Sequence, residues 1–208
     1  RSADPNLRWL SIGLLGLVVT LLVLQPDFGM AALVIAAWFI QFFVAGMPIR
    51  WVAAMFATGI AAVLLAYSFV PHVTDRFDRF LFPGTGENYQ VETALGAFHA
   101  GGPFGRGPGE GIVKNVLPDA HTDFIFAVAG EEFGLLACIA IAGIFAFIVL
   151  RGFSLLMRET DYFALLAGTG LLVQFGLQAA INMGVSLRLL PAKGMTLPFI
   201  SYGGSSLL

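Results

Sequence analysis

The sequence is poor in charged residues and in cysteine. Only 12% of its 208 residues are charged, whereas an ordinary soluble domain carries roughly 25%. So few charged side chains cannot cover the surface of a soluble globule, and a hydrophobic share of 58% excludes a disordered chain. A formal net charge of −2 leaves no basic excess for binding nucleic acid. The single cysteine, Cys138, excludes a disulfide framework. An integral membrane protein is the class that remains.

Long stretches with few or no charges predict the architecture. Four stretches contain no Asp, Glu, Lys or Arg, and a fifth is apolar apart from two adjacent glutamates. The four are 9–26, 28–49, 51–71 and 162–187, and the fifth is 124–150. A transmembrane helix needs about 20 apolar residues, so each stretch predicts one span. A shorter stretch, 197–208, predicts a truncated sixth span. We therefore expect an all-α, polytopic transmembrane helix bundle and a piece of a longer protein that lacks helices at both ends.

The longest connection, 72–123, predicts a large structured loop. It carries 11 of the 24 charged residues, and aromatic and apolar residues run through it. Because successive spans alternate in direction, this loop shares a face with the connections at 25–27 and 188–196. Arginine is denser in the connections on the other face, which predicts that the other face is cytoplasmic and that the long loop is extracytoplasmic.

Asp123 is the last charged residue before the fifth predicted span. It could cap that helix, because Asp accepts hydrogen bonds from free first-turn amides. It could instead be a general base, because partial desolvation at the membrane boundary raises the pKa of a carboxyl group. Position alone favours the cap. His121 beside it suggests a metal, but three histidines spread along the chain make a weak metal site. No metal site is assigned, and a divalent cation is the one cofactor that is left open.

Polar residues inside the predicted spans form two groups. Glu131 and Glu132 lie about two turns into their span, where ionisable residues are costly and mark functional or tightly paired sites. Adjacent helical residues point about 100° apart, so both cannot face one partner. Gln174, Gln178 and Asn182 recur every four residues on one helical face. They are either interhelical packing contacts or the lining of a polar cavity, and both interpretations place them inside.

Three connections offer further candidates. The segment 75–80 contains Arg76 and Arg79 and is either an interfacial amphipathic helix or a cationic clamp for phosphate. The glycine-rich segment 101–111 is either a tightly turning connection or a backbone cradle for phosphate. Asp27, in the turn before the second span, is a candidate cap for that span.

Together the motifs resemble the SEDS family (shape, elongation, division and sporulation). The order and spacing of the motifs match the family along nearly the whole chain. The residues within the motifs are more similar to those of the division member than to those of the elongation member. The motifs are Gln25–Gly29, Tyr89–Gln90, Leu117–Ala127, Gly130–Glu132 and Leu190–Ser206. The resemblance implies that this chain is the C-terminal part of one ten-helix membrane domain.

The resemblance also implies an activity. It implies a peptidoglycan glycosyltransferase that polymerises lipid II on the outer face of the bacterial inner membrane, at the division septum. A class B penicillin-binding transpeptidase and other division membrane proteins are the implied partners, with no role for nucleic acid. The family's essential aspartate falls on Asp123. The substrate-binding candidates are Asp27, Gln90 and His121, together with the cations Arg76, Arg79, Lys114 and Lys193 for the pyrophosphate.

Two alternatives to the enzyme stay open at this stage. A lipid II flippase would use the intramembrane glutamates and the amide stripe as a polar path. A non-catalytic scaffold would only recruit division proteins.

Overall fold

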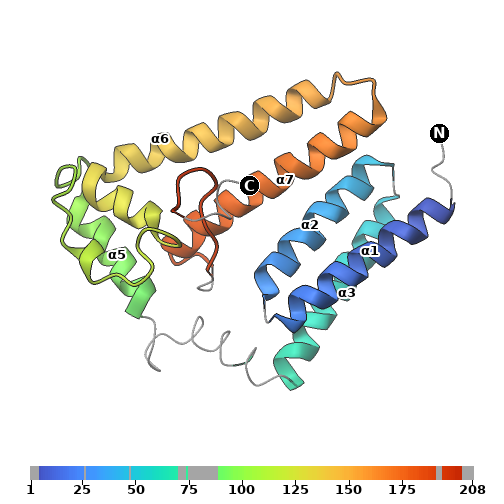
Figure 1. Ribbon diagram of the computed structural model, residues 1–208, viewed down its shortest axis with the longest axis horizontal. Coiled ribbons are helices and arrows are strands. Elements are labelled where there is room, and N and C mark those ends of the chain that lie inside the picture. Colours follow the sequence, from blue (N-terminus) through green and yellow to red (C-terminus); the bar gives the residue numbers. More distant parts are fainter. Residues whose placement is uncertain are drawn as a thin grey trace. The chain divides into compact units, whose positions relative to one another are not determined.

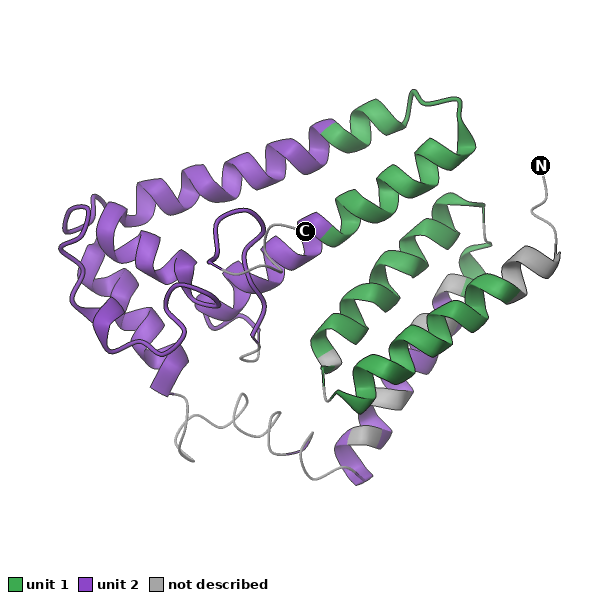
Figure 2. Cartoon of the chain, viewed as in Figure 1, with its two compact units in different colours: residues 1–52, 152–174 green, residues 53–151, 175–208 purple. Residues whose placement is uncertain are grey.

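The computed structural model describes residues 5–25, 27–46, 48–69, 74, 89–190 and 194–202. Every regular element in this described part is helical, and none is a strand. The described residues divide into two compact units, residues 1–52 with 152–174 and residues 53–151 with 175–208 (Figure 2). Three of the predicted cations, Arg76, Arg79 and Lys193, lie outside the described residues.

In the first unit, two apolar helices pack against each other. They are α1 (Pro5–Leu24) and α2 (Phe28–Val44), which fall on the first two predicted spans. Asp27 caps α2, because its Oδ1 accepts a hydrogen bond from the Met30 amide at 3.1 Å. The capping role predicted for Asp27 is therefore confirmed. The indole of Trp38 donates to Ser11 Oγ at 2.9 Å and joins the two helices.

A glycine lets α2 bond to the first part of α7 (Tyr162–Ser186), which belongs to the same unit. Gln41 Nε2 donates to the Leu166 carbonyl at 3.1 Å. A Cβ atom at Gly170 would lie 2.0 Å from that Nε2, so only glycine leaves room for the contact. The Tyr162 hydroxyl adds a second bond, to the Ala45 carbonyl at 3.0 Å.

The remaining helices are α3 (Ile49–Phe69), α5 (Tyr89–Gly101) and α6 (Ile125–Leu156), with a 3₁₀ turn at Val113–Asn115 (Figure 1). Among the described residues, α6 and α7 are long and apolar enough to cross a membrane. The predicted link 151–161 begins too early, since α6 continues through Arg151 to Leu156. A long arginine stem can run along an apolar helix and carry its charge to the membrane surface, so one arginine does not end the helix.

Helix α6 is interrupted at Gly134, a break that the apolar pattern did not predict. Gly134 has φ 80° and ψ −178°, a conformation that is essentially restricted to glycine. The carbonyls of Gly102 and Pro103 accept the freed amides of Leu135 and Leu136, at 2.9 and 3.3 Å. A Cβ at Gly134 would lie 2.4 Å from the Gly105 nitrogen. The backbone of the glycine-rich segment therefore packs directly against α6 at this break.

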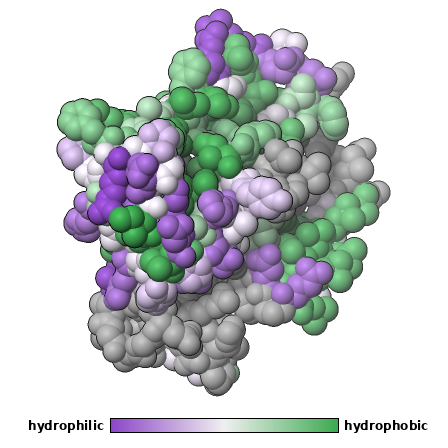
Figure 3. Space-filling view, turned by 60° about the vertical axis from the view of Figure 1, so that its left-hand side comes forward, coloured by the Kyte–Doolittle hydropathy of each residue, from purple (hydrophilic) through white to green (hydrophobic). Residues whose placement is uncertain are grey.

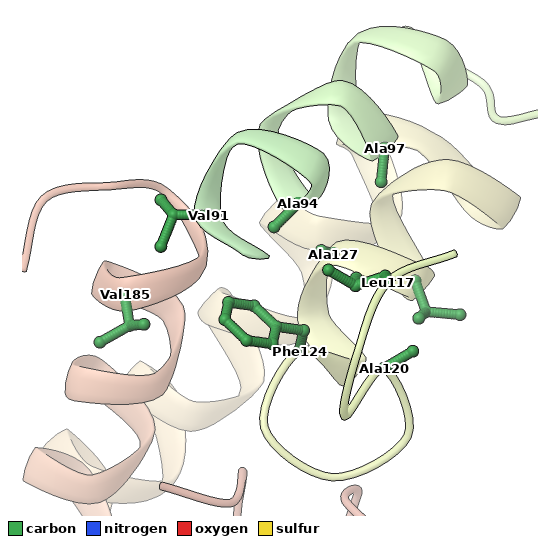
Figure 4. Close-up of a cluster of buried hydrophobic side chains, with 9 residues drawn as sticks. Val91, Ala94, Ala97, Leu117, Ala120, Phe124, Ala127 and Val185 are labelled. Atoms are coloured by element: carbon green, nitrogen blue, oxygen red, sulfur yellow. The ribbon is translucent and has the colours of Figure 1, made fainter. Parts of the chain in front are cut away.

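The core of the second unit joins α5, the segment before α6, the start of α6 and the end of α7. Figure 4 shows Phe124 in the middle of this cluster, between small side chains of α5 and Val185 of α7. The buried members are Val91, Ala94, Ala97, Leu117, Ala120, Phe124, Ala127, Val128 and Val185. A Cβ at Gly101 would lie 2.0 Å from the Gly130 carbonyl, so the end of α5 rests directly on the α6 backbone.

The predicted truncated span, 197–208, is not helical over its described residues 197–202. Ser201 Oγ accepts from the Leu197 amide at 2.7 Å and donates to the Thr122 carbonyl at 2.6 Å, and the Tyr202 amide donates to the His121 carbonyl at 2.8 Å. Amides that would donate along a helix therefore donate instead to a side chain within the turn and to a carbonyl of the segment before α6. Residues 203–208 lie outside the described part.

Candidate functional site

A tight turn at residues 119–124 presents Asp123. The Asp119 carbonyl accepts hydrogen bonds from the amides of Thr122, Asp123 and Phe124, at 3.1, 3.0 and 3.2 Å. Asp119 itself has φ 54°, a left-handed conformation that Asp tolerates better than most residues. The turn fixes the main chain of Asp123 one residue before the buried Phe124.

Two side chains from elsewhere in the unit hold the backbone of Asp123. Asn182 Nδ2 donates to the Asp123 carbonyl at 2.7 Å, and Ser201 Oγ donates to the Thr122 carbonyl. These two carbonyls belong to the peptide groups on either side of the Asp123 Cα atom. Asn182 Nδ2 also donates to the Met195 carbonyl, which fixes the segment 194–202 to the same point.

The carboxylate of Asp123 is half-buried and has no hydrogen-bond donor within the part of the chain that the structure describes. Burial raises the pKa of Asp123 above its ordinary value, and the nearby negative charge of Asp119 raises this pKa further. A Cβ at Gly194 would lie 2.8 Å from Oδ2, so the carboxylate faces a bare backbone segment. No first-turn amide of α6 donates to it, so the capping interpretation is wrong. A fixed, partly desolvated carboxylate of this kind suits a general base.

Glu131 is fully buried and bonds to the loop that precedes α6. Its Oε1 accepts the amides of Ile112 and Val113 at 2.7 and 2.8 Å, and its Oε2 accepts the Lys114 amide at 3.0 Å. Three successive amides converging on one point form an anion-binding nest, and Glu131 fills it from within the chain. A Cβ at Gly111 would lie 2.9 Å from Oε2, so the loop approaches this closely because residue 111 is glycine.

Glu132 binds a different group of the same loop. It forms an ion pair with the ammonium of Lys114, which also donates to the Gly109 carbonyl at 3.0 Å. The two glutamates therefore bond different groups, in agreement with their angular separation. Lys114, a predicted pyrophosphate ligand, is bonded within the protein.

The glycine-rich segment does not present a free backbone cradle at its central residues. The amides of Gly105, Arg106 and Gly107 donate to carbonyls of Gly101, Glu131 and Glu132, at 2.8, 3.0 and 3.0 Å. Their hydrogen-bonding capacity is used within the protein. The interpretation of this segment as a tightly turning connection is the one that the hydrogen bonds support.

Most of the amide stripe on α7 lies inside, as predicted. Asn182 is buried, and Gln178 Nε2 donates to the Thr196 carbonyl and hydroxyl at 3.1 and 3.3 Å. Gln174 is exposed in this chain, which contradicts the expectation that the whole stripe is internal. The stripe joins α7 to the segment 194–202, which is a packing role.

The other predicted residues are spread over both units. Gln90 is half-buried near the start of α5, His121 is exposed just before Asp123, and Asp27 belongs to the first unit. Figure 3 brings the α5 end forward and shows hydrophilic and hydrophobic residues side by side on this face. Ser201 and Gly194 are neighbours of Asp123 that the residue pattern did not predict. Both lie within the motif Leu190–Ser206, which was the available signal.

Comparison with known proteins shows a single family. The model of the FtsW, RodA and SpoVE cell cycle proteins matches residues 4–208. A protein of Caulobacter vibrioides is 46% identical over 192 residues, which are 92% of this chain and 49% of that protein. One of Trichlorobacter lovleyi is 40% identical over 218 residues, covering 99% and 56%. Both are named probable peptidoglycan glycosyltransferase FtsW. The chain thus spans about half the length of the curated relatives it matches.

Two solved structures share the fold. One comes from work on the structural coordination of polymerization and crosslinking by a peptidoglycan synthase complex, with a TM-score of 0.78, 31% identity, and coverage of 95% of this chain and 56% of that chain. The other is a mutant of the rod shape determining protein RodA from Thermus thermophilus, with a TM-score of 0.63, 29% identity, and coverage of 100% and 54%. The family match over nearly the whole chain and the FtsW names of its relatives agree with the motifs, and the chain belongs to the FtsW, RodA and SpoVE family, the SEDS proteins, as an FtsW-like member.

Proposed function

We propose that the full-length protein is a peptidoglycan glycosyltransferase that polymerises lipid II during cell division, with Asp123 as its general base. The observation that carries the proposal is the half-buried Asp123 carboxylate, which has no donor among the described residues while the carbonyls on both sides of it are fixed. The FtsW names of the relatives support the activity.

The proposed setting follows from the same similarity. The protein is a multi-pass protein of the bacterial inner membrane at the septum, with five full spans in this chain and its active face outside. Its partner is a class B penicillin-binding transpeptidase. The similarity to a chain of a peptidoglycan synthase complex supports a partner of this kind.

The chemistry is a single displacement at a sugar carbon. Asp123 takes the proton from the 4-hydroxyl of the acceptor sugar as that oxygen attacks the anomeric carbon of the donor. The bond from that carbon to the pyrophosphate oxygen breaks, the lipid pyrophosphate leaves with the electron pair, and the configuration inverts. A positioned general base supplies about 10²–10⁴-fold in rate. The raised pKa of Asp123 makes it a stronger base than an ordinary carboxylate.

The leaving pyrophosphate requires cationic groups. Arg76, Arg79 and Lys193 are the proposed ligands, and they lie outside the described residues. Lys114 has a different role in this proposal, because its ammonium is bonded to Glu132 and to the loop backbone.

Transport has less support than catalysis. The flippase alternative depended on Glu131, Glu132 and the α7 amides as a polar path. Both glutamates, Gln178 and Asn182 are each bonded to backbone or side-chain groups of the same unit. No contact of the described residues favours a path or a purely scaffolding role.

The test is lipid II polymerisation by the purified full-length protein carrying Asp123→Asn. We expect a loss of product of at least about 10²-fold with the fold intact. Glu92→Gln is the matched control, since Glu92 is an exposed carboxylate on α5 in the same unit. Near-normal product from Asp123→Asn would remove Asp123 as the base.

A further inference from the structure

Asn182 links the turn that carries Asp123 to the segment 194–202. It is 1% exposed, and its Nδ2 group carries two hydrogens, both of which are donated to main-chain carbonyls. One carbonyl belongs to Asp123 and the other to Met195, the neighbour of Gly194. We infer that Asn182 is a positioning residue, which sets where the Asp123 carboxylate stands relative to the segment 194–202. This inference rests on the proposed function.

The unequal bonding of its side chain argues against simple packing. Asn182 Oδ1 is buried and has no hydrogen-bond partner among the described residues. An unpaired buried acceptor destabilises the fold, and an apolar side chain of similar volume would avoid that cost. The two bonds from Nδ2 are what an apolar residue could not provide. One of them ends on the peptide group that follows the proposed base.

Ser201 provides the matching restraint on the other side of Asp123. Its hydroxyl donates to the Thr122 carbonyl, and it is 5% exposed. The Asp123 Cα atom therefore lies between two peptide groups that are held by side chains from α7 and from the segment 194–202. The main chain is fixed, while the carboxylate has no donor among the described residues and is left to accept a proton.

The fixed geometry sets the expected size of the effect. A displacement of about 1 Å between reacting groups can lower a rate by about 10²-fold. Asn182 is buried, so its loss should not remove a substrate contact. We therefore expect Asn182→Ala to lower kcat by about 10–100-fold and to leave the KM for lipid II nearly unchanged.

Gln178 supplies the matched control. It lies one turn earlier on α7 and donates to Thr196 in the same segment, but not to Asp123. If attachment of that segment were all that mattered, Gln178→Ala would lose as much activity as Asn182→Ala. Our inference predicts that Gln178→Ala keeps kcat within about 3-fold of the unchanged protein, because the bond to Asp123 remains.

The experiment measures kcat, KM and thermal unfolding of the full-length protein with lipid II as substrate. The variants are Asn182→Ala, Ser201→Ala, Gln178→Ala and Asp123→Asn. Lower kcat with unchanged KM in Asn182→Ala, and a smaller loss in Gln178→Ala, would support the inference. Should Asn182→Ala fail to fold, Ser201→Ala decides, since it removes one restraint and is expected to lower kcat about 3–30-fold at unchanged KM.

Two results separate the inference from the proposed function. An Asn182→Ala protein with near-normal kcat, alongside an inactive Asp123→Asn protein, would overturn the positioning role and leave the glycosyltransferase proposal standing. Equal losses in Asn182→Ala and Gln178→Ala would overturn it as well. An active Asp123→Asn protein would overturn the proposed function itself.

Discussion

Replacing Glu131 by glutamine tests how the loop before α6 is held. The two oxygens of Glu131 accept three amides of residues 112–114. Glutamine keeps one oxygen and replaces the other by an amide donor, so at least one loop amide must face a donor. An unmet buried amide costs about 1–3 kcal/mol. A factor of ten in an equilibrium corresponds to about 1.4 kcal/mol, so local opening of the loop becomes about 5–150-fold more frequent.

Amide hydrogen exchange of the full-length protein measures this opening directly. The exchange rates of the Ile112, Val113 and Lys114 amides should rise by that factor in Glu131→Gln. They should rise further in Glu131→Ala, which leaves all three amides unpaired. Glu110→Gln is the control, because Glu110 is an exposed carboxylate in the same loop. Equal exchange at residues 112–114 in Glu131→Gln and Glu110→Gln would refute the reasoning.

Four further predictions concern the site and the helix break. Because the charge of Asp119 raises the pKa of Asp123, Asp119→Asn should lower that pKa and extend activity to lower pH in a pH–rate profile; an unmoved acid limb would contradict this. Since that pKa is raised by folding, ionisation of Asp123 costs stability, so Asp123→Asn should melt at the same or higher temperature at pH 7, and the gain should vanish below the ordinary carboxyl pKa. Gly194→Ala places a Cβ 2.8 Å from the Asp123 carboxylate, so kcat should fall while the melting temperature holds, whereas Gly134→Ala strains the backbone and should lower the melting temperature.

The sequence was sufficient to predict five of the helices, because hydrophobic length is a local property, but it did not predict α5 and wrongly predicted a helix over 197–202. Charge-free stretches marked α1, α2, α3 and α7, and an apolar stretch with two glutamates marked α6, to within a few residues at most ends. The break at Gly134 could not be seen in this way, because its apolar neighbours continue the helical pattern. It exists because carbonyls of residues 102 and 103, some thirty positions earlier, accept the freed amides.

The site was predictable only as far as residue types allow. Asp123 stood out because it is a lone charge at the start of an apolar stretch. Asn182 stood out only as part of the amide stripe, and Ser201 did not stand out. Their bonds at Asp123 were not predictable, because both end on main-chain carbonyls, which have no sequence signature. An ionisable side chain inside a predicted span is costly, so the position of Glu131 indicated that its carboxylate is paired with another group. That partner is three loop amides rather than a cation, and amides are present in almost any sequence.

The interruption of α6 changes how much of that helix has to enter hydrocarbon. The portion after Gly134, Leu135–Leu156, is by itself about 33 Å long, enough to cross an apolar layer of about 30 Å. Its first two amides already have acceptors in the glycine-rich segment. The turn of helix that carries Glu131 and Glu132 can therefore stay at the boundary, where each carboxylate is spared the cost of entering hydrocarbon. A single glycine thus separates the polar end of α6 from the part that is long enough to cross the lipid.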